Sequence, residues 1–515
     1  MMGRIFKTNM DRRQFIFSSA AAASFAAAHS LPAQAAVPFH HLPASDVHYQ
    51  RTRGYVEETP IHEYHWASDA AYERFRDLKF GVRVHWGIYS ILGLPNESWP
   101  YLSKSFPQRM AYNELYKTWN PVGFDADAWV DLFQAGGAKM FSFTTKHHEG
   151  FSMFDTRTRV RSRVDWTAAG GPKIRPCDLA YSIMETPFRR DVTRELCDAA
   201  HKRNMAIDLY FSHPDWYDAD FRPYALHPMQ TAASIHDREV LARQKQGAVF
   251  TVGPDPTPAE ASRMMLRHRA QLIELLSRYG RIDMVCLDQW LGPAVWPQLR
   301  ETLLQIRALQ PDVMLRARGI GNYGDYYTPE RFIPGGKENS PLPWFVIYPL
   351  GTSFSYDPNP ANYKGERWIV HNLIDSVSKG GNFMVGIGPD GNGRFAPEAA
   401  RQLKAAGDWL RLAGEAIYAT RPRPGDLWRD GENVRYTQSK DGHTLYAFFL
   451  DWPGKIAYLP SVKPKKSSVI TLLGSSTPFS WSWDSSKGTE IQLPDGMQDE
   501  SRRPCHWAWA LKISI

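Results

Sequence analysis

The chain alternates short apolar runs with segments of helical periodicity over most of its length. Runs rich in β-branched and aromatic residues predict buried strands, and they occur at Phe80–His85, Lys139–Thr145, Met205–Ser212, Ile282–Asp288, Val313–Arg318 and Asn382–Ile387. The segments whose apolar residues recur at helical spacing are Ala126–Ala135, Asp191–Lys202, Ala261–Tyr279, Asn362–Ser378 and Glu398–Leu412. Strands that alternate with helices in this way predict βα units and a parallel sheet.

The number of these units favours a closed barrel over an open sheet. The unit repeats at least six times over roughly 330 residues, which is typical of a (β/α)8 barrel. Fewer than eight strands are distinct in the pattern, so we expect an α/β fold with a distorted TIM barrel.

The pattern changes after the proline-rich stretch Arg421–Gly425. Period-two runs follow at Thr444–Leu450 and Ser468–Leu473, separated by turn clusters and without helix-forming stretches. Such a pattern predicts a small β-sandwich. We therefore expect a barrel over residues 37–421 and a β-sandwich domain over residues 422–515.

The first 36 residues have the layout of an export signal rather than of a folded domain. The pair Arg12-Arg13 precedes a stretch of small residues from Ile16 to Ala28, and Ala33–Ala35 forms an A-x-A cleavage site. The stretch is too short to span a bilayer. The paired arginines favour the twin-arginine route, so we expect a periplasmic or secreted protein; the alternative is a helical N-terminal arm.

Composition excludes several classes of protein. With 43% hydrophobic residues the chain is too apolar for disorder, and four Cys are too few for a disulfide scaffold. No C-x-x-C pair or zinc spacing occurs. The net charge of +7 is not gathered into a block typical of nucleic-acid binding. No other stretch approaches 18 apolar residues, so we expect no membrane-spanning helix.

Polar and aromatic side chains gather at the predicted strand ends, where barrels of this kind carry their reacting groups. The set comprises His85, His147, His148, Tyr210, Asp288 and Arg318, with Glu330 downstream. Aromatic rings stack on sugar faces, and His, Glu and Arg hydrogen-bond hydroxyls, so the set suits a polyhydroxylated substrate. No phosphate loop, H-E-x-x-H or Rossmann fingerprint appears. Hydrolysis by paired carboxylates is the predicted chemistry.

Five blocks of sequence carry a family resemblance. In chain order they are Lys79–Ser90 (KFGVRVHWGIYS), Thr144–Phe151 (TTKHHEGF), Gly324–Glu330 (GDYYTPE), Lys379–Asn382 (KGGN) and Gly414–Tyr418 (GEAIY). In this order they resemble the family 29 α-L-fucosidases. The resemblance implies a retaining hydrolase with a barrel-like catalytic domain and a C-terminal β-sandwich.

The resemblance also implies roles for two carboxylates. Asp288 stands where the family keeps its nucleophilic aspartate, and the alternative is a strand-end Asp that caps the next turn. Glu330 stands twelve residues after Arg318, as the general acid/base does in some members. The alternative to this role is a structural one for Glu330, because Thr328-Pro329-Glu330 also has the pattern of a helix start.

Other residues resemble the family's sugar-binding groups. His85, His147 and His148 resemble its ligands for the sugar hydroxyls, and Trp99, Tyr210 and Arg318 are expected to complete the pocket. A metal is not expected, because adjacent residues in a strand point to opposite faces and no carboxylate or Cys stands at ligand spacing. No cofactor is expected either.

Two departures from the family put fucose itself in question. Arg83 and Cys286 stand where members often have aromatic residues around the methyl group of fucose, and Phe354 is the comparable wall that remains. A buried guanidinium needs a polar partner. Arg83 therefore either reaches the C6 region of the substrate, which we favour slightly, or is held by a nearby carboxylate. Nearby, Ser98 stands in place of a family glutamate, with Glu97 beside it.

Three hypotheses of function follow. The first is an exported hydrolase of terminal α-L-fucosyl residues on glycans or polysaccharides. The second is an α-L-galactosidase-type hydrolase for fucose-configured sugars with a polar or sulfated C6. The third is a catalytically disabled sugar-binding homologue, against which the presence of both Asp288 and Glu330 argues.

Overall fold

The computed structural model describes residues 41–44, 46–222, 227–229, 257–334 and 342–515. The expected export signal lies outside these residues. Among the helices that are described, none combines the length and apolar character needed to cross a membrane.

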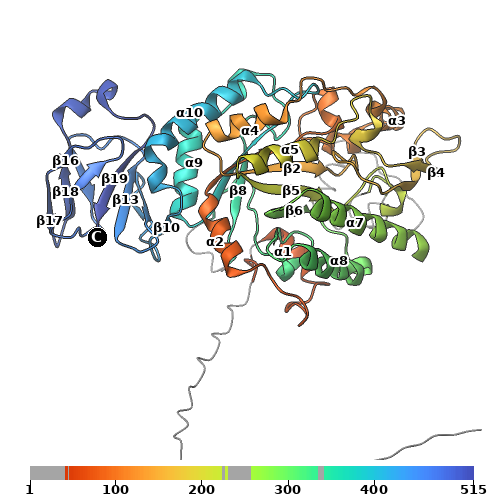
Figure 1. Ribbon diagram of the computed structural model, residues 1–515, viewed down its shortest axis with the longest axis horizontal. Helices are drawn as coiled ribbons and strands as arrows, with labels where there is room; N and C mark the ends of the chain where they lie inside the picture. The colour runs from red at the N-terminus through yellow and green to blue at the C-terminus, as the bar shows by residue number, and fades with distance from the viewer. Residues whose placement is uncertain (1–40, 45, 223–226, 230–256, 335–341) are drawn as a thin grey trace, which may run out of the picture. The chain divides into compact units, whose positions relative to one another are not determined.

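Seven parallel strands form the sheet of the larger domain, in the order β7-β6-β5-β2-β1-β9-β8. Figure 1 shows several of them at the centre of this domain with helices around them. Their bounds are β1 (Phe80–Val84), β2 (Met140–Lys146), β5 (Ala206–Ser212), β6 (Met284–Asp288), β7 (Met314–Leu315), β8 (Phe345–Pro349) and β9 (Asn382–Ile387). Each strand is almost wholly buried, which explains the near-continuous apolar runs in the sequence.

An irregular segment occupies the position between β7 and β8. Tyr326 forms a parallel bridge with Arg316, next to β7. Further along, Tyr327 and Glu330 form parallel bridges with Trp344 and Ile347, at β8. The segment Tyr326–Glu330 therefore takes the place of an eighth strand, and the distorted (β/α)8 barrel expected from the sequence is confirmed.

Side-chain caps mark the start of several helices in this domain. Asp125 accepts a hydrogen bond from the backbone N–H of Ala128, and Thr257 and Glu260 form a capping box. The helices are α1 (Val47–Thr52), α2 (Asp69–Leu78), α3 (Phe106–Asn113), α4 (Ala126–Ala135), α5 (Val192–Lys202), α7 (Pro258–Arg278), α8 (Trp296–Leu309), α9 (Glu366–Ser378) and α10 (Pro397–Ala413). The apolar stripes read from the sequence are the faces that these helices bury, as in α7 and α10.

Some elements differ from the sequence prediction. The run Val313–Arg318 forms only the two-residue strand β7, and beyond it Arg316 makes a single parallel bridge with Tyr326. The hairpin of β3 (Val160–Asp165) and β4 (Lys173–Leu179) was not predicted. In β3 buried residues alternate with more exposed ones, β4 has no buried residue, and both strands carry several charges, so no apolar run marks the hairpin.

The C-terminal part forms two sheets around a separate apolar core. One has the order β10-β12-β13-β19-β15-β16 with β11 paired to β12, and the other the order β14-β18-β17. The strands are β10 (Arg421–Pro422), β11 (Arg429–Asp430), β12 (Val434–Gln438), β13 (Thr444–Phe449), β14 (Ile456–Leu459), β15 (Ile470–Leu472), β16 (Pro478–Phe479), β17 (Trp481–Asp484), β18 (Gly488–Gln492) and β19 (Trp509–Ser514). The expected β-sandwich is confirmed.

Candidate active site

A cavity of about 550 Å³ opens at the carboxyl ends of the barrel strands. It brings together all ten residues that the sequence singled out, namely Arg83, His85, Trp99, His147, His148, Tyr210, Asp288, Arg318, Glu330 and Phe354. Six residues that were not proposed as site residues also line it: His48, Asn96, Glu97, Gln289, Arg331 and Ile347. The volume falls in the range of small-molecule sites.

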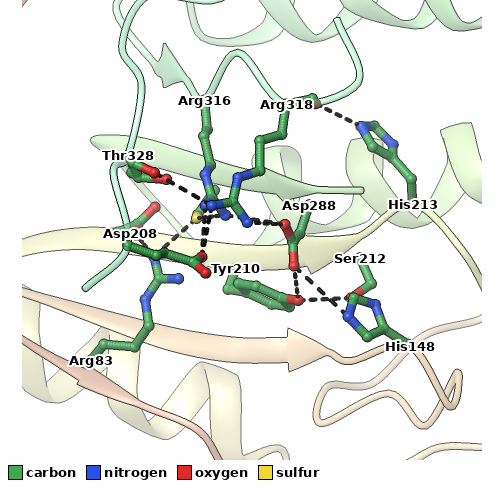
Figure 2. Close-up of polar contacts among 12 residues, drawn as sticks. Arg83, His148, Asp208, Tyr210, Ser212, His213, Asp288, Arg316, Arg318 and Thr328 are labelled. Carbon is green, nitrogen blue, oxygen red and sulfur yellow. Dashed lines mark hydrogen bonds and ion pairs between the residues drawn. The ribbon is translucent and has the colours of Figure 1, made fainter. Parts of the chain in front are cut away.

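Asp288 ends β6 and lies at the centre of a hydrogen-bonded cluster (Figure 2). Its Oδ2 accepts a hydrogen bond from Tyr210 at 2.6 Å, and its Oδ1 accepts from Arg318 Nη1 at 2.8 Å and Arg316 Nη1 at 3.3 Å. Burial raises the pKa of Asp288, but Arg318 and Arg316 outweigh it and hold this pKa well below its usual range. The carboxylate is thus ionised and bound by side chains rather than capping a turn.

Glu330 shares its arginine partners with Asp288. Its Oε1 lies 2.7 Å from Arg318 Nη2 and 3.2 Å from Arg316 Nη2, and its side chain is 39% exposed. Partial burial raises the pKa of Glu330, while Arg318 and Arg316 lower it further than burial raises it. No helix starts at Thr328, so the helix start that the sequence offered as an alternative at this glutamate is not formed. The guanidiniums of Arg318 and Arg316 therefore each contact both carboxylates.

The three histidines lie at the ends of β1 and β2. His148 Nδ1 lies 2.9 Å from Ser212 Oγ, and its Nε2 lies 3.8 Å from Asp288 Oδ2. The His147 and His148 ring centroids are 4.2 Å apart, and both rings line the cavity. The expectation that adjacent residues point to opposite faces is wrong here, because β2 ends at Lys146 and both histidines lie beyond the pleated strand.

Aromatic rings form the walls of the cavity. Phe354 stacks on the His85 ring with centroids 5.0 Å apart, and Trp99 packs edge-on against His148 at 4.8 Å. Burial, with Arg83 nearby, holds the pKa of His85 well below its usual range, so this imidazole is neutral. A neutral imidazole between aromatic walls is suited to hydrogen-bonding an uncharged hydroxyl.

Arg83 is held by a carboxylate. Its Nη2 donates to Asp208 Oδ2 at 3.1 Å and lies 2.9 Å from Cys286 Sγ, and all three side chains are buried (Figure 2). Of the two arrangements left open by the sequence, this is the second. The slight preference for an Arg83 directed at the substrate is thus not supported, although the residue does line the cavity.

The neighbours Glu97 and Ser98 contact different parts of the site. Ser98 is fully buried, and its Oγ lies 2.6 Å from His147 Nδ1, which fixes the orientation of that ring. Glu97 has a φ of +54° and lines the cavity, where burial raises the pKa of its carboxyl. Because adjacent side chains diverge, the glutamate faces the cavity and the serine supports the histidine behind it.

Arg316 joins the two carboxylates and was not singled out from the sequence. It is fully buried, contacts both Asp288 and Glu330, and lies 3.2 Å from Cys286 Sγ. An arginine two residues before Arg318 in a predicted strand shares its face, and that spacing was the available signal. As for metal, the described residues contain no group of three or more His, Cys, Asp or Glu arranged to hold an ion.

Two carboxylates bridged by arginines, beside three histidines at the open end of a (β/α)8 barrel, define a glycoside hydrolase. The family description "Alpha-L-fucosidase" matches residues 55–415, and "Alpha-L-fucosidase C-terminal domain" matches residues 430–514. The chain belongs to the alpha-L-fucosidase family.

Relatives with the same name span both domains. The chain is 27% identical to human tissue alpha-L-fucosidase over 466 residues, which covers 85% of this chain and 88% of that protein. It is 28% identical to the mouse tissue enzyme over 473 residues, covering 85% and 91%.

Solved structures share the fold. Alpha-L-fucosidase isoenzyme 1 from Paenibacillus thiaminolyticus superposes with a TM-score of 0.68 at 24% identity, covering 86% of this chain and 98% of that one. A GH29 alpha-L-fucosidase from Bacteroides thetaiotaomicron, trapped as a covalent intermediate with 2-fluoro-fucosyl fluoride, has a TM-score of 0.68 at 21% identity, covering 89% and 100%.

Proposed function

We propose that this protein is a retaining exo-α-L-fucosidase that removes terminal α-L-fucosyl residues from glycans or polysaccharides. The observation that carries the proposal is the placement of two carboxylates on one arginine: Arg318 contacts Asp288 through Nη1 and Glu330 through Nη2. The identity of the sugar is inferred from family membership, because the curated relatives are named alpha-L-fucosidases.

The geometry supports a double displacement. Asp288, held ionised, attacks the anomeric carbon and forms a glycosyl-enzyme ester, while Glu330 gives its proton to the departing glycosidic oxygen. Glu330 then takes a proton from water, whose oxygen attacks the same carbon and releases Asp288. His85, His147 and His148 are positioned to bind the sugar hydroxyls, and Trp99 and Phe354 to enclose the ring.

The first step depends on the protonation state of Glu330. Glu330 must carry a proton to act as an acid, yet its arginine contacts favour the ionised form in the unliganded protein. A neutral sugar that enters between the carboxylates weakens those contacts and raises the pKa of Glu330. We therefore expect substrate binding and protonation of Glu330 to be coupled.

The proposal is tested by following hydrolysis of an aryl α-L-fucoside by NMR. The first-formed sugar should be the α-anomer, and the aryl α-L-galactoside should be a poorer substrate. Formation of the β-anomer would refute retention, and the absence of turnover would refute the enzyme assignment. No contact of Arg83 favours the alternative with a polar C6, because Asp208 binds its guanidinium.

The proposal includes export by the twin-arginine route to the periplasm or the medium. It is supported by Arg12-Arg13 and by the A-x-A sequence at Ala33–Ala35. The full chain expressed in a bacterium with this pathway should appear, shortened, outside the cytoplasm. Replacing both arginines by lysine should retain it inside, and unchanged export of that variant would contradict the proposal.

A further inference from the structure

The short helix α1 contributes a side chain to the catalytic cavity from outside the region that matches the fucosidase family. The family match begins at residue 55, whereas α1 spans Val47–Thr52 and its His48 lines the cavity. The contribution is therefore a property of this chain that the family match does not account for. Its position beside Asp288 and Arg318 suggests a role in binding substrate.

Several contacts fix α1 on the loop that follows Arg318. The Asp46 side chain accepts from the backbone N–H of Tyr49 and so caps the helix. The Asn322 side chain accepts from the Leu42 backbone N–H at 3.3 Å and donates to the Glu58 carbonyl at 2.7 Å. The helix is thus tied at both ends to the 3-10 turn Gly321–Tyr323.

A second tie comes from the loop that follows β6. The Arg51 guanidinium lies 4.3 Å from the centre of the Trp290 ring, in cation–π geometry. Trp290 is two residues beyond Asp288 in the chain. Helix α1 is consequently braced against the loop that directly follows Asp288, which holds His48 on this side of the cavity.

On this side of the cavity, one polar atom in each of two side chains has no hydrogen-bond partner within the described part of the chain. Neither Nδ1 of His48 nor Oε1 of Gln289 is paired, and Gln289 is 95% buried with a φ of +66°. Buried polar groups are normally paired, and exceptions call for an explanation. Both residues line the cavity, so a bound ligand is the partner available to them.

Exposure separates the bottom of the cavity from its mouth. His85, His147 and His148 are at most 4% exposed and lie at the bottom, whereas His48 and Glu330 are more exposed and lie at the mouth. The fucosyl residue of a chain end enters first and occupies the bottom. The leaving group, which is the rest of the glycan, must then lie at the mouth, within reach of the acid Glu330.

We propose that His48 forms a subsite for the leaving-group sugar. The subsite rests on the proposed fucosidase function. It implies that the substrate is a fucosylated glycan whose penultimate residue offers hydroxyls. His48 has a pKa held well below its usual range by burial and by Arg318 and Arg316, so its ring is neutral. A neutral imidazole offers one donor and one acceptor nitrogen, as hydroxyl recognition requires.

The test compares two substrates in wild type, His48→Leu and His48→Gln. One is an α-L-fucosyl oligosaccharide and the other an aryl α-L-fucoside, whose leaving group has no hydroxyls. In His48→Leu, kcat/KM for the oligosaccharide should fall about tenfold more than for the aryl substrate, as expected for the loss of a hydrogen bond. His48→Gln should recover part of the loss. Thermal melting checks that each variant is folded.

His62→Leu is the matched control, because His62 is exposed on the same N-terminal segment and does not line the cavity. It should behave as wild type with both substrates. Equal losses with the two substrates in His48→Leu, or no loss with either, would overturn the subsite and leave the fucosidase function intact. A wild type without activity on the aryl fucoside would instead overturn the proposed function, and the subsite with it.

Discussion

The hydroxyl of Tyr210 donates a hydrogen bond of 2.6 Å to Oδ2 of Asp288. The same hydroxyl accepts a hydrogen bond from Ser212 at 3.1 Å, so the Ser212 oxygen is free to accept from Nδ1 of His148. His148 thus reaches the cluster through both ring nitrogens, with Nδ1 beside Ser212 and Nε2 3.8 Å from Oδ2 of Asp288. Charge-assisted bonds of this kind stabilise the ionised carboxylate.

Tyr210→Phe removes the donor while keeping the ring. We expect kcat for an aryl α-L-fucoside to fall about 10- to 100-fold, because a hydrogen bond to a charged group contributes about 1.5–3 kcal/mol. Tyr458→Phe, at an exposed position on β14, is the control and should leave kcat unchanged. Wild-type kcat in Tyr210→Phe would show that the bond does not assist Asp288.

Asp288→Ala should abolish turnover while the protein still folds. Loss of the nucleophile should lower kcat by a factor on the order of a thousand or more. Azide should restore part of the activity, because a small anion fits the space left by the carboxylate. Asp198→Ala, on the exposed face of α5, is the matched control. Near-normal activity of pure Asp288→Ala would contradict the assignment.

Glu330→Ala should discriminate between leaving groups. An aryl oxide hardly needs protonation, whereas a sugar alkoxide does. Glycosylation should therefore slow more for fucosyl oligosaccharides than for a nitrophenyl fucoside, as measured by kcat/KM across leaving groups of different pKa. A uniform loss across that series would move the acid role to another carboxyl, with Glu97 in the same cavity as the next candidate.

The pH dependence should respond to Arg318. Asp288 must be ionised, and Arg318 and Arg316 hold its pKa well below the usual range, so the acid limb of kcat/KM should lie at very low pH in wild type. Arg318→Met removes one of these charges and raises that pKa. The acid limb should then move to higher pH. An unmoved limb, in a variant that is folded, would show that Arg318 does not control the charge of Asp288.

Arg83→Phe should destabilise the protein, because it leaves Asp208 buried without its partner. Breaking one side of a buried ion pair costs about 3–5 kcal/mol in the free energy of unfolding. Urea denaturation measures this loss, and the double variant Arg83→Phe/Asp208→Leu should recover much of it. If Arg83→Phe alone keeps wild-type stability, the pair does not contribute to the fold.

Much of the barrel was predictable because its strands and helices carry strong periodic patterns. The strand Asn382–Ile387 and the helix Ala126–Ala135 have the bounds that the sequence predicted. The strand Phe345–Pro349 was missed, because prolines at both sides mark the segment as loop. The segment Tyr326–Glu330 was missed as a strand position, because its bridges depend on tertiary contacts that no local pattern encodes.

The site was predictable where chemistry coincides with strand ends, as at Asp288 and Tyr210. It was not predictable where distant segments meet. His48 lies on a six-residue helix 240 positions before Asp288, and no periodicity links the two. The partner of Arg83 was likewise open, because Asp208 faces it from a different strand, 125 residues away.

The two proposed catalytic carboxylates are held by different kinds of structure. Asp288 ends a strand that pairs along its length with β5, so the sheet itself sets its position. Glu330 belongs to the segment Tyr326–Glu330, which single bridges attach to its neighbours. Changes in the length of the flanking loops can therefore move Glu330 without disrupting the pairing of neighbouring barrel strands. The proton donor is the part of this machinery most open to evolutionary relocation, while the nucleophile is anchored by the architecture.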